Sequence, residues 1–162
     1  MPTDHLDSSA MSPEATRFAQ ACLALRNEGL LRKAAFRAEN LPVDLLPNVA
    51  ILDWAPPENL RVRLAGTALC TSYGRDITGL DVLDLPSGLP PEHNRDALMQ
   101  ALRTPDLTAH LVSFQHGGMT VAYERLAHPL VDTEGTARWL AVWVKLRPGL
   151  TRTVFMGLVG ED

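Results

Sequence analysis

Apolar residues near the start of the chain recur at helical spacing. Ser12-Pro13-Glu14 can begin a helix, because serine caps free amides and proline suits the first helical position. Gly29 is a natural helix end. The pattern predicts a flanking helix over residues 12–29, with one apolar face made of Ala15, Phe18, Ala19, Cys22 and Leu25. Either the sheet or another subunit must cover this face.

Further along, five segments have patterns typical of strands. Leu60–Leu64 alternates between arginine on one face and valine or leucine on the other, which indicates a half-buried antiparallel strand. Gly117-Gly118 separates two other segments, and such a link is typical of a hairpin in which both residues take positive φ. The five predicted strands are Asn48–Trp54, Leu60–Leu64, Thr108–His116, Met119–Leu130 and Ala137–Leu146.

Three short helices are predicted between the second and third of these strands, at Thr67–Tyr73, Leu80–Leu85 and Pro91–Arg103. Two hairpins separated by helices favour an α+β fold, in which one five-stranded antiparallel sheet carries the short helices on one face. A small cavity can lie between those helices and the sheet. We expect one domain over residues 30–150, after a disordered N-terminus (residues 1–11) and the flanking helix, with a tail at residues 151–162.

The composition of the chain argues against two classes of binding partner, nucleic acid and membranes. The formal net charge is −4, and such a surface has no general attraction for nucleic acid or anionic lipid. No apolar run approaches the roughly 20 residues that span a bilayer. The N-terminus lacks the pattern of a secretory signal, and the two cysteines, Cys22 and Cys70, fit a reducing compartment. We therefore expect a cytoplasmic protein that does not bind nucleic acid or membranes.

Two blocks in the middle of the chain carry a resemblance. Arg63-Leu64-Ala65-Gly66-Thr67-Ala68-Leu69 is followed by Tyr73-Gly74-Arg75-Asp76-Ile77-Thr78-Gly79. Together they resemble the RLxGTxL…YGRDxTG pattern of a bacterial, alphaproteobacterial-type family of stand-alone PAS-like domains. Tyr123-Glu124-Arg125-Leu126, near the end, also fits this family. The resemblance extends over about residues 30–147.

The resemblance implies a PAS fold with a role in sensing or regulation. It predicts a separate protein partner in signalling, with the interaction gated by a small ligand, whereas the apolar face of the N-terminal helix predicts a homodimer. The alternative is a sensor that holds haem, flavin or a metabolite in the cavity, and a small α+β enzyme is a third hypothesis. The sequence contains no GxSxG, GxxxxGK[ST], GxGxxG or HExxH motif, so we predict no catalytic residues.

The motif residues have a structural interpretation of their own. Gly66 stands where a strand becomes a helix, and glycine permits a close backbone crossing there. Asp76 can accept bonds from backbone amides or pair with an arginine, for which Arg63 and Arg125 are the candidates. We assign this structural role to the set Arg63, Gly66, Gly74, Arg75, Asp76, Gly79 and Arg125.

Several other side chains are candidates for lining the cavity or an interface. Cys70 lies where flavin-binding PAS relatives place a reactive cysteine, but their Asn-Cys-Arg-Phe-Leu-Gln pattern is absent. His110 and His116 share a strand face, and His128 is on the next strand, but no familiar metal spacing results and we predict no metal site. The candidate cavity residues are Cys70, Tyr73, His110, Phe114, Tyr123 and Trp139, and the candidate dimer interface is Phe18, Cys22 and Leu25.

Overall fold

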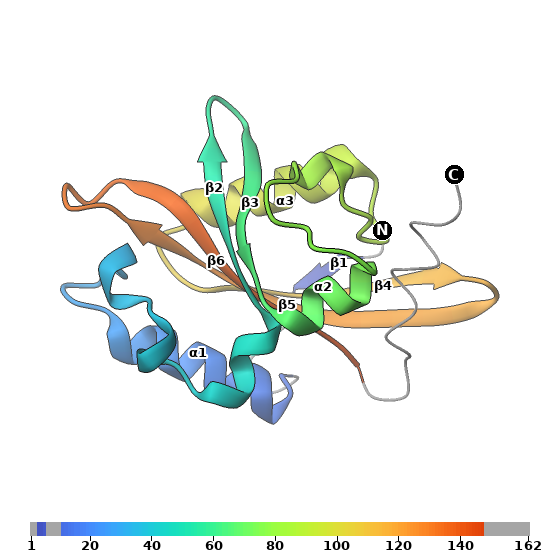
Figure 1. Cartoon of the computed structure of the whole chain (residues 1–162), viewed down its shortest axis with the longest axis horizontal. Coiled ribbons are helices and arrows are strands. Elements are labelled where there is room, and N and C mark those ends of the chain that lie inside the picture. The colour runs from blue at the N-terminus through green and yellow to red at the C-terminus, as the bar shows by residue number, and fades with distance from the viewer. Residues whose placement is uncertain (1–2, 6–10, 148–162) are drawn as a thin grey trace.

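The computed structural model describes residues 3–5 and 11–147, and its strands form one antiparallel sheet (Figure 1). Neighbouring strands follow the order β1-β4-β5-β6-β2-β3. The strand bounds are β1 Thr3–His5, β2 Val49–Ala55, β3 Asn59–Ala65, β4 Thr108–His116, β5 Met119–Val131 and β6 Ala137–Leu146. All five expected strands are present, and the short strand β1, which the sequence pattern did not predict, extends the sheet beyond β4.

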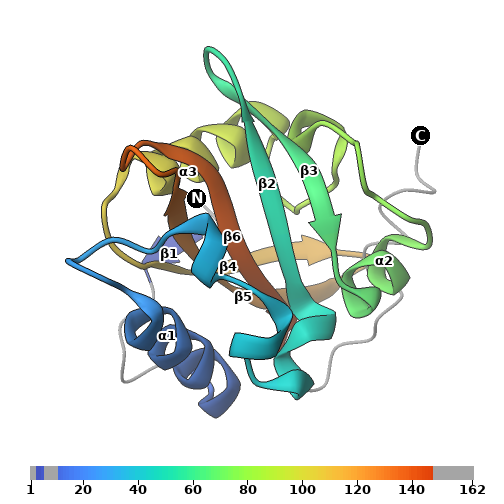
Figure 2. The ribbon, with the colours of Figure 1, turned by 60° about the vertical axis from the view of Figure 1, so that its left-hand side comes forward.

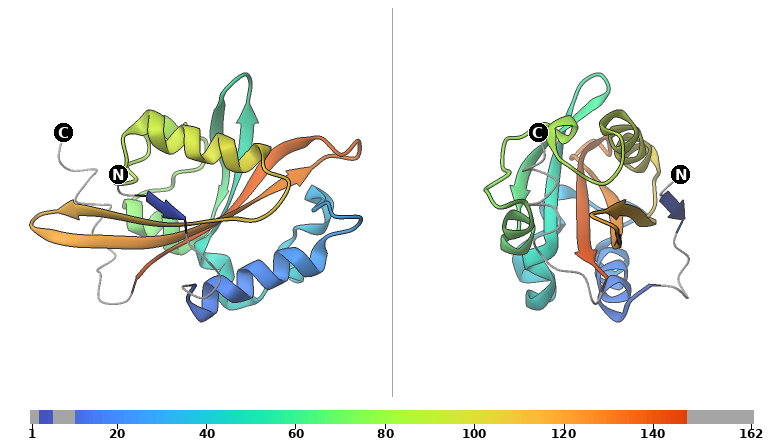
Figure 3. Two further views of the ribbon diagram at one scale, coloured as in Figure 1. Left: turned by 180° about the vertical axis from the view of Figure 1, so that it is seen from behind. Right: turned by 90° about the vertical axis from the view of Figure 1, so that its right-hand side faces the viewer.

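Helices cover both faces of the sheet, and Figure 3 shows α1 and α3 on opposite sides of it. The α-helices are α1 Pro13–Leu25, α2 Thr67–Tyr73 and α3 Pro91–Arg103. Short 3-10 helices lie in the connections at η1 Lys33–Ala35, η2 Ala38–Asn40, η3 Val43–Asn48 and η4 Val82–Asp84. The expected α+β class is therefore confirmed, with short helices on one face of the sheet and the N-terminal helix on the other.

Helix α1 begins where the sequence predicts and ends earlier. The Ser12 side chain accepts a hydrogen bond from the Ala15 amide at 3.2 Å, which caps the first turn. The helix ends at Leu25, because residues 27–30 form a tight turn in which Glu28 and Gly29 both take positive φ. Gly29 therefore belongs to this turn and not to the helix itself.

The apolar face of α1 packs on its own sheet. Phe18 stacks on Trp143 of β6 with ring centroids 6.3 Å apart, and the edge of Phe36 meets Phe18 at the same distance. Phe18 and Cys22 have no exposed surface, whereas Leu25 at the end of the helix is partly buried. The dimer interface predicted from this stripe is therefore wrong for Phe18 and Cys22, because the chain's own sheet covers them.

The opposite face of the sheet packs against α2, η4 and α3, and Figure 2 shows α2 at the end of β3. Leu52, Leu60 and Val62 of β2 and β3 meet Leu98 and Leu102 of α3 in one apolar cluster. The alternation of side chains along each strand separates this cluster from the one below α1.

Gly66 joins the two layers at a very close backbone approach. A Cβ atom built on it would lie 2.3 Å from the Pro47 carbonyl oxygen, so only glycine fits. The Gly66 amide donates to the Val49 carbonyl at 2.8 Å, which ties the start of α2 to the start of β2. The end of β3 and the first turn of α2 are therefore both held against the start of β2.

Candidate functional site

A small internal cavity lies between the sheet and the cover formed by α2, η4 and α3. Its volume is about 70 Å³. Most of its lining is aliphatic and comes from Ala50, Leu52, Val62, Leu69, Ile77, Val82, Leu85, Leu98, Val142 and Val144. The side chains with polar atoms in the lining are Tyr73, Ser87, Asn94, Tyr123 and Arg125.

Arg125 of β5 is the charged residue of this lining. It is only 5% exposed. Its Nη1 donates to Asn94 Oδ1 of α3 at 2.5 Å, and its Nη2 has no hydrogen-bond partner. No carboxylate among residues 11–147 lies within ion-pair distance of it. A buried guanidinium without a counter-charge is unfavourable and rarely found in a protein interior.

The strand register explains how Arg125 reaches the cavity. Arg125 pairs with Val144 of β6 and with His110 of β4, and Val144 lines the same cavity. Its sequence neighbour Glu124 therefore faces the other side, where its carboxylate accepts a bond from the Ser12 amide at 2.9 Å. The nearest acid in the sequence is on the wrong face of the sheet to neutralise Arg125.

Two tyrosines flank the cation. The Tyr123 hydroxyl donates to the Ser87 carbonyl at 2.6 Å, which holds the loop before α3 against β5. Burial is the main cause that raises the pKa of both Tyr73 and Tyr123, so both phenols stay neutral at physiological pH. The lining contains no acidic side chain and no histidine.

The structure brings two of the six candidate cavity residues, Tyr73 and Tyr123, into the lining. Phe114 packs edge-on against Tyr123 with centroids 6.4 Å apart, at the outer end of the cavity face. His110 lies beside Arg125 on β4 but outside the lining. Trp139 belongs to the other face of the sheet, with Lys33 over its ring, so its assignment to the cavity is wrong.

Cys70 also lies outside the lining. Its thiol is 3.9 Å from Asp76 Oδ1 and 4.0 Å from the Ala65 carbonyl oxygen, near the junction of β3 and α2. The cysteine is half-buried and packs against the apolar cluster of this face. It is not positioned to react with a molecule in the cavity.

The motif residues mostly form turns. Gly74 ends α2 with φ 73°, and Gly79 has φ 89° in the next turn. Asp76 Oδ1 accepts from the Thr78 amide at 2.9 Å, and this bond is the main cause that lowers the Asp76 pKa. The predicted arginine pairs with Asp76 are wrong, because Arg63 pairs with Asp53 at 3.3 Å and Arg125 is in the cavity. Arg75, next to Asp76, is exposed.

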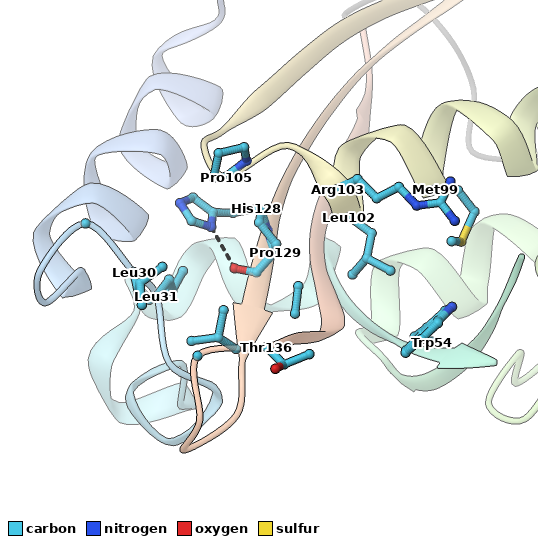
Figure 4. A pocket seen from close by; sticks show the side chains of 14 residues that line it. Leu30, Leu31, Trp54, Met99, Leu102, Arg103, Pro105, His128, Pro129 and Thr136 are labelled. Carbon is cyan, nitrogen blue, oxygen red and sulfur yellow. Dashed lines mark hydrogen bonds between the residues drawn. The ribbon is translucent and has the colours of Figure 1, made fainter. Parts of the chain in front are cut away.

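A second, more open concavity of about 340 Å³ lies at the other end of the sheet (Figure 4). Leu30, Leu31, Trp54 and Thr136 contribute to its walls. The buried ring of His128 has both nitrogens bonded: Nδ1 to the Pro129 carbonyl at 2.8 Å and Nε2 to Arg26 Nε at 3.0 Å. Arg103, the charged residue of this lining, pairs with Glu58, so this concavity has no unmatched charge.

No metal-binding group is apparent in the part of the chain that the structure describes. No three histidine, cysteine, aspartate or glutamate side chains of residues 11–147 gather closely enough to hold an ion. His110 and His128 lie on opposite faces of the sheet, because their partners Arg125 and Ala141 belong to opposite layers. Among the described helices, none is long and apolar enough to cross a membrane.

Sequence reasoning missed Asn94 and Ser87, and it placed Arg125 elsewhere. One pattern in the sequence could have located Arg125. Tyr123, Arg125 and Ala127 are alternate residues of one strand and therefore share a face, and most other positions of this strand are apolar. A cation on the buried face of an interior strand needs a partner, and that requirement points to the cavity.

Comparisons with known proteins give fold neighbours only. No family model and no curated protein sequence matches the chain. Solved structures that resemble it are light-oxygen-voltage (LOV) domains. A fungal LOV photoreceptor has 14% identity and a TM-score of 0.49, covering 87% of this chain and 95% of that chain. The blue-light photoreceptor Aureochrome1 LOV, in its light state, has 19% identity and a TM-score of 0.43, covering 72% of this chain and 91% of that chain.

An RNA-binding LOV receptor has 16% identity and a TM-score of 0.48, covering 97% of this chain and 41% of that chain. All three TM-scores are below 0.5, so we draw no functional argument from them. The chain's own strand order and helix placement carry the assignment to a PAS-like fold.

Proposed function

We propose that this chain is a PAS-like sensory and regulatory module. A small molecule enters the cavity between the sheet and the α2–η4–α3 cover, and the cover passes the change to a protein partner. The observation that carries this proposal is the cavity with Arg125 buried in its wall and without a counter-charge among residues 11–147. A site with few convergent polar groups in an apolar lining is the usual composition of a small-molecule pocket.

The architecture supports a response of the cover to an occupant. Segment 77–85 is held to β3 through backbone bonds between Val62 and both Gly79 and Leu80, at 2.7 and 2.9 Å. Beyond those bonds the segment consists of turns and the single turn η4. Short elements with few backbone bonds open at low free-energy cost, so an occupant can shift their population between conformations.

The size of the cavity does not favour haem or flavin. Sites for drug-sized ligands measure about 300–1,000 Å³, whereas this cavity measures about 70 Å³. Either cofactor would need several core side chains to leave the space between sheet and cover. A metabolite of a few heavy atoms fits without such a rearrangement.

The test is a thermal-shift screen of the purified protein with small molecules of different charge, repeated on Ala50→Leu. Ala50 lines the cavity from β2, so a leucine there fills it. We expect a compound that raises Tm of the original protein and leaves the variant unchanged. If no compound in the screen raises Tm, or if active compounds stabilise the filled variant equally, the cavity is not a sensing site.

The signalling half of the proposal has its own test. The tagged protein, with and without the active compound, is incubated with lysate of its native organism and cross-linked. We expect one partner whose recovery changes with the compound and does not change for Ala50→Leu. Equal recovery in both states would show that the cavity does not control the interaction.

A further inference from the structure

We infer that the cavity binds a short-chain aliphatic monocarboxylate, whose carboxylate contacts the Arg125 guanidinium. This inference rests on the proposed function, in which the cavity takes a ligand, and it adds the charge and the chemical class of that ligand. It is carried by the position, burial and bonding of Arg125.

The cavity lining carries one positive charge, on Arg125, and no negative charge. Arginine remains a cation at physiological pH, and Arg125 is 5% exposed. The cavity lining contains no aspartate or glutamate, and no carboxylate of residues 11–147 is in ion-pair distance. Glu124 is occupied on the opposite face by the Ser12 amide. An anionic ligand would supply the counter-charge that residues 11–147 do not provide.

The donors available match a carboxylate. Arg125 Nη1 already bonds Asn94 Oδ1, whereas Nη2 is unpartnered. Because its Oδ1 accepts that bond, the Asn94 amide nitrogen is a further donor in the same lining. A guanidinium binds planar carboxylates through parallel N–H bonds, so these groups fit one carboxylate better than a neutral carbonyl.

The aliphatic part of the lining determines which chemical group can be attached to the carboxylate of the ligand. Leu52, Val62, Ile77, Leu98 and Val142 surround the space and offer only aliphatic surface. Inorganic phosphate or sulfate would leave polar oxygens against this surface without donors, which is unfavourable. A short alkyl chain packs there favourably, and a volume of about 70 Å³ has room for only a few carbon atoms.

The experiment compares propionate and isobutyrate with propionamide and isobutyramide, which have nearly the same shape and no charge. Each is titrated into ¹⁵N-labelled protein at constant ionic strength and pH 7, and amide chemical shifts are followed. We expect saturable shifts at cavity residues with the carboxylates and roughly tenfold or greater weakening with the amides, since the ionic bonds are lost.

Variants locate the binding. Arg125→Met should abolish the saturable shifts, whereas Arg63→Met, a matched change at an exposed arginine of β3, should leave them intact. Ala50→Leu keeps the charge and fills the space, so it should also abolish binding and provides a second test if Arg125→Met does not fold.

The outcomes separate this inference from the proposed function. If the amides bind as tightly as the carboxylates, or if Arg125→Met retains full carboxylate binding, the inference is overturned while the cavity remains a ligand site. If carboxylates shift only surface amides without saturation, the inference is also overturned. The proposed function is then decided by the broader screen, which includes neutral and cationic compounds.

Discussion

The two faces of the sheet are packed in different ways. Below α1, aromatic rings stack against each other, and Phe18, Cys22 and Trp143 have no exposed surface. On the opposite face, the aliphatic residues below α2, η4 and α3 leave a cavity with Arg125 in its wall. The same strands supply both faces, because successive side chains alternate. The α1 face is filled around Phe18 and Trp143, although an open concavity of about 330 Å³ lies elsewhere on it, beside Phe36 and Leu41, whereas the opposite face leaves a space beside Arg125.

The first prediction concerns the α1 face and has the largest expected effect. Phe18→Ala should lower the free energy of unfolding by about 3–5 kcal/mol, because it removes a fully buried ring from between Trp143 and Phe36. Urea unfolding followed by circular dichroism measures this change. Leu23→Ala on the exposed side of the same helix is the control, since Leu23 is 47% exposed.

A small effect of Phe18→Ala, close to that of Leu23→Ala, would mean that α1 does not contribute to the core. The oligomeric state should be measured with the same samples. Loss of a dimer without loss of stability would return Phe18 to the role of an interface residue.

The second prediction compares matched alanines on neighbouring strands. Ala141→Leu places extra methyl groups in the filled α1 face and should cost about 1–3 kcal/mol. Ala50→Leu places the same groups in the cavity and should cost less than about 1 kcal/mol, because space is already present. Thermal unfolding of both variants measures the difference. Equal costs would show that the two faces are packed alike.

The third prediction is a pH dependence of stability, which is smaller. Burial is the main cause that lowers the pKa of His128 on the α1 face, and the neighbouring Arg26 lowers it further, against the raising effects of the Pro129 carbonyl and Asp106. The unfolded chain therefore takes up a proton first as the pH falls. The resulting stability is fully present above the ordinary histidine pKa of about 6.5 and is lost below it.

The measurement is the free energy of unfolding at several pH values between neutral and mildly acidic, for the original protein and for His128→Gln. The original protein should lose more stability than the variant on acidification. Parallel curves for the two proteins would remove His128 as the cause.

The fourth prediction concerns rates of cysteine modification. Burial raises the pKa of the Cys22 thiol to about 12, so almost no thiolate forms at neutral pH and the sulfur is covered. Cys70 is half-buried at the cavity cover and should react first with iodoacetamide. Mass spectrometry of peptides gives both rates, and in guanidinium chloride the two should become similar. Fast labelling of Cys22 in the native protein would indicate that α1 opens readily.

Most of the fold could be predicted from the sequence because its signals are local. Gly66 and Gly74 mark the ends of α2, and the positive φ of Gly117 and Gly118 forms the hairpin between β4 and β5. Strand β1 carried no signal, since its three residues are too few to show a period. Its pairing with β4 depends on the rest of the sheet.

The candidate site was harder to predict because alternation tells which residues share a face and not which layer covers it. Trp139 and Trp143 share one face of β6, and that face is the α1 face. Arg125 could not be matched with Asn94 from the sequence, because their contact depends on where α3 crosses β5. Only the three-dimensional arrangement reveals that this arginine has no carboxylate partner among residues 11–147.

The placement of Glu124 and Arg125 on opposite sides of one strand has a mechanical consequence. The Glu124 carboxylate holds the amide of Ser12, the residue that caps α1, while Arg125 reaches into the cavity on the far side. The two side chains share a single stretch of backbone. A shift or twist of β5 that accommodates a ligand at Arg125 would therefore also move the carboxylate that anchors the first turn of α1. In this way β5 would couple the cavity on one face of the sheet to the helix on the other face.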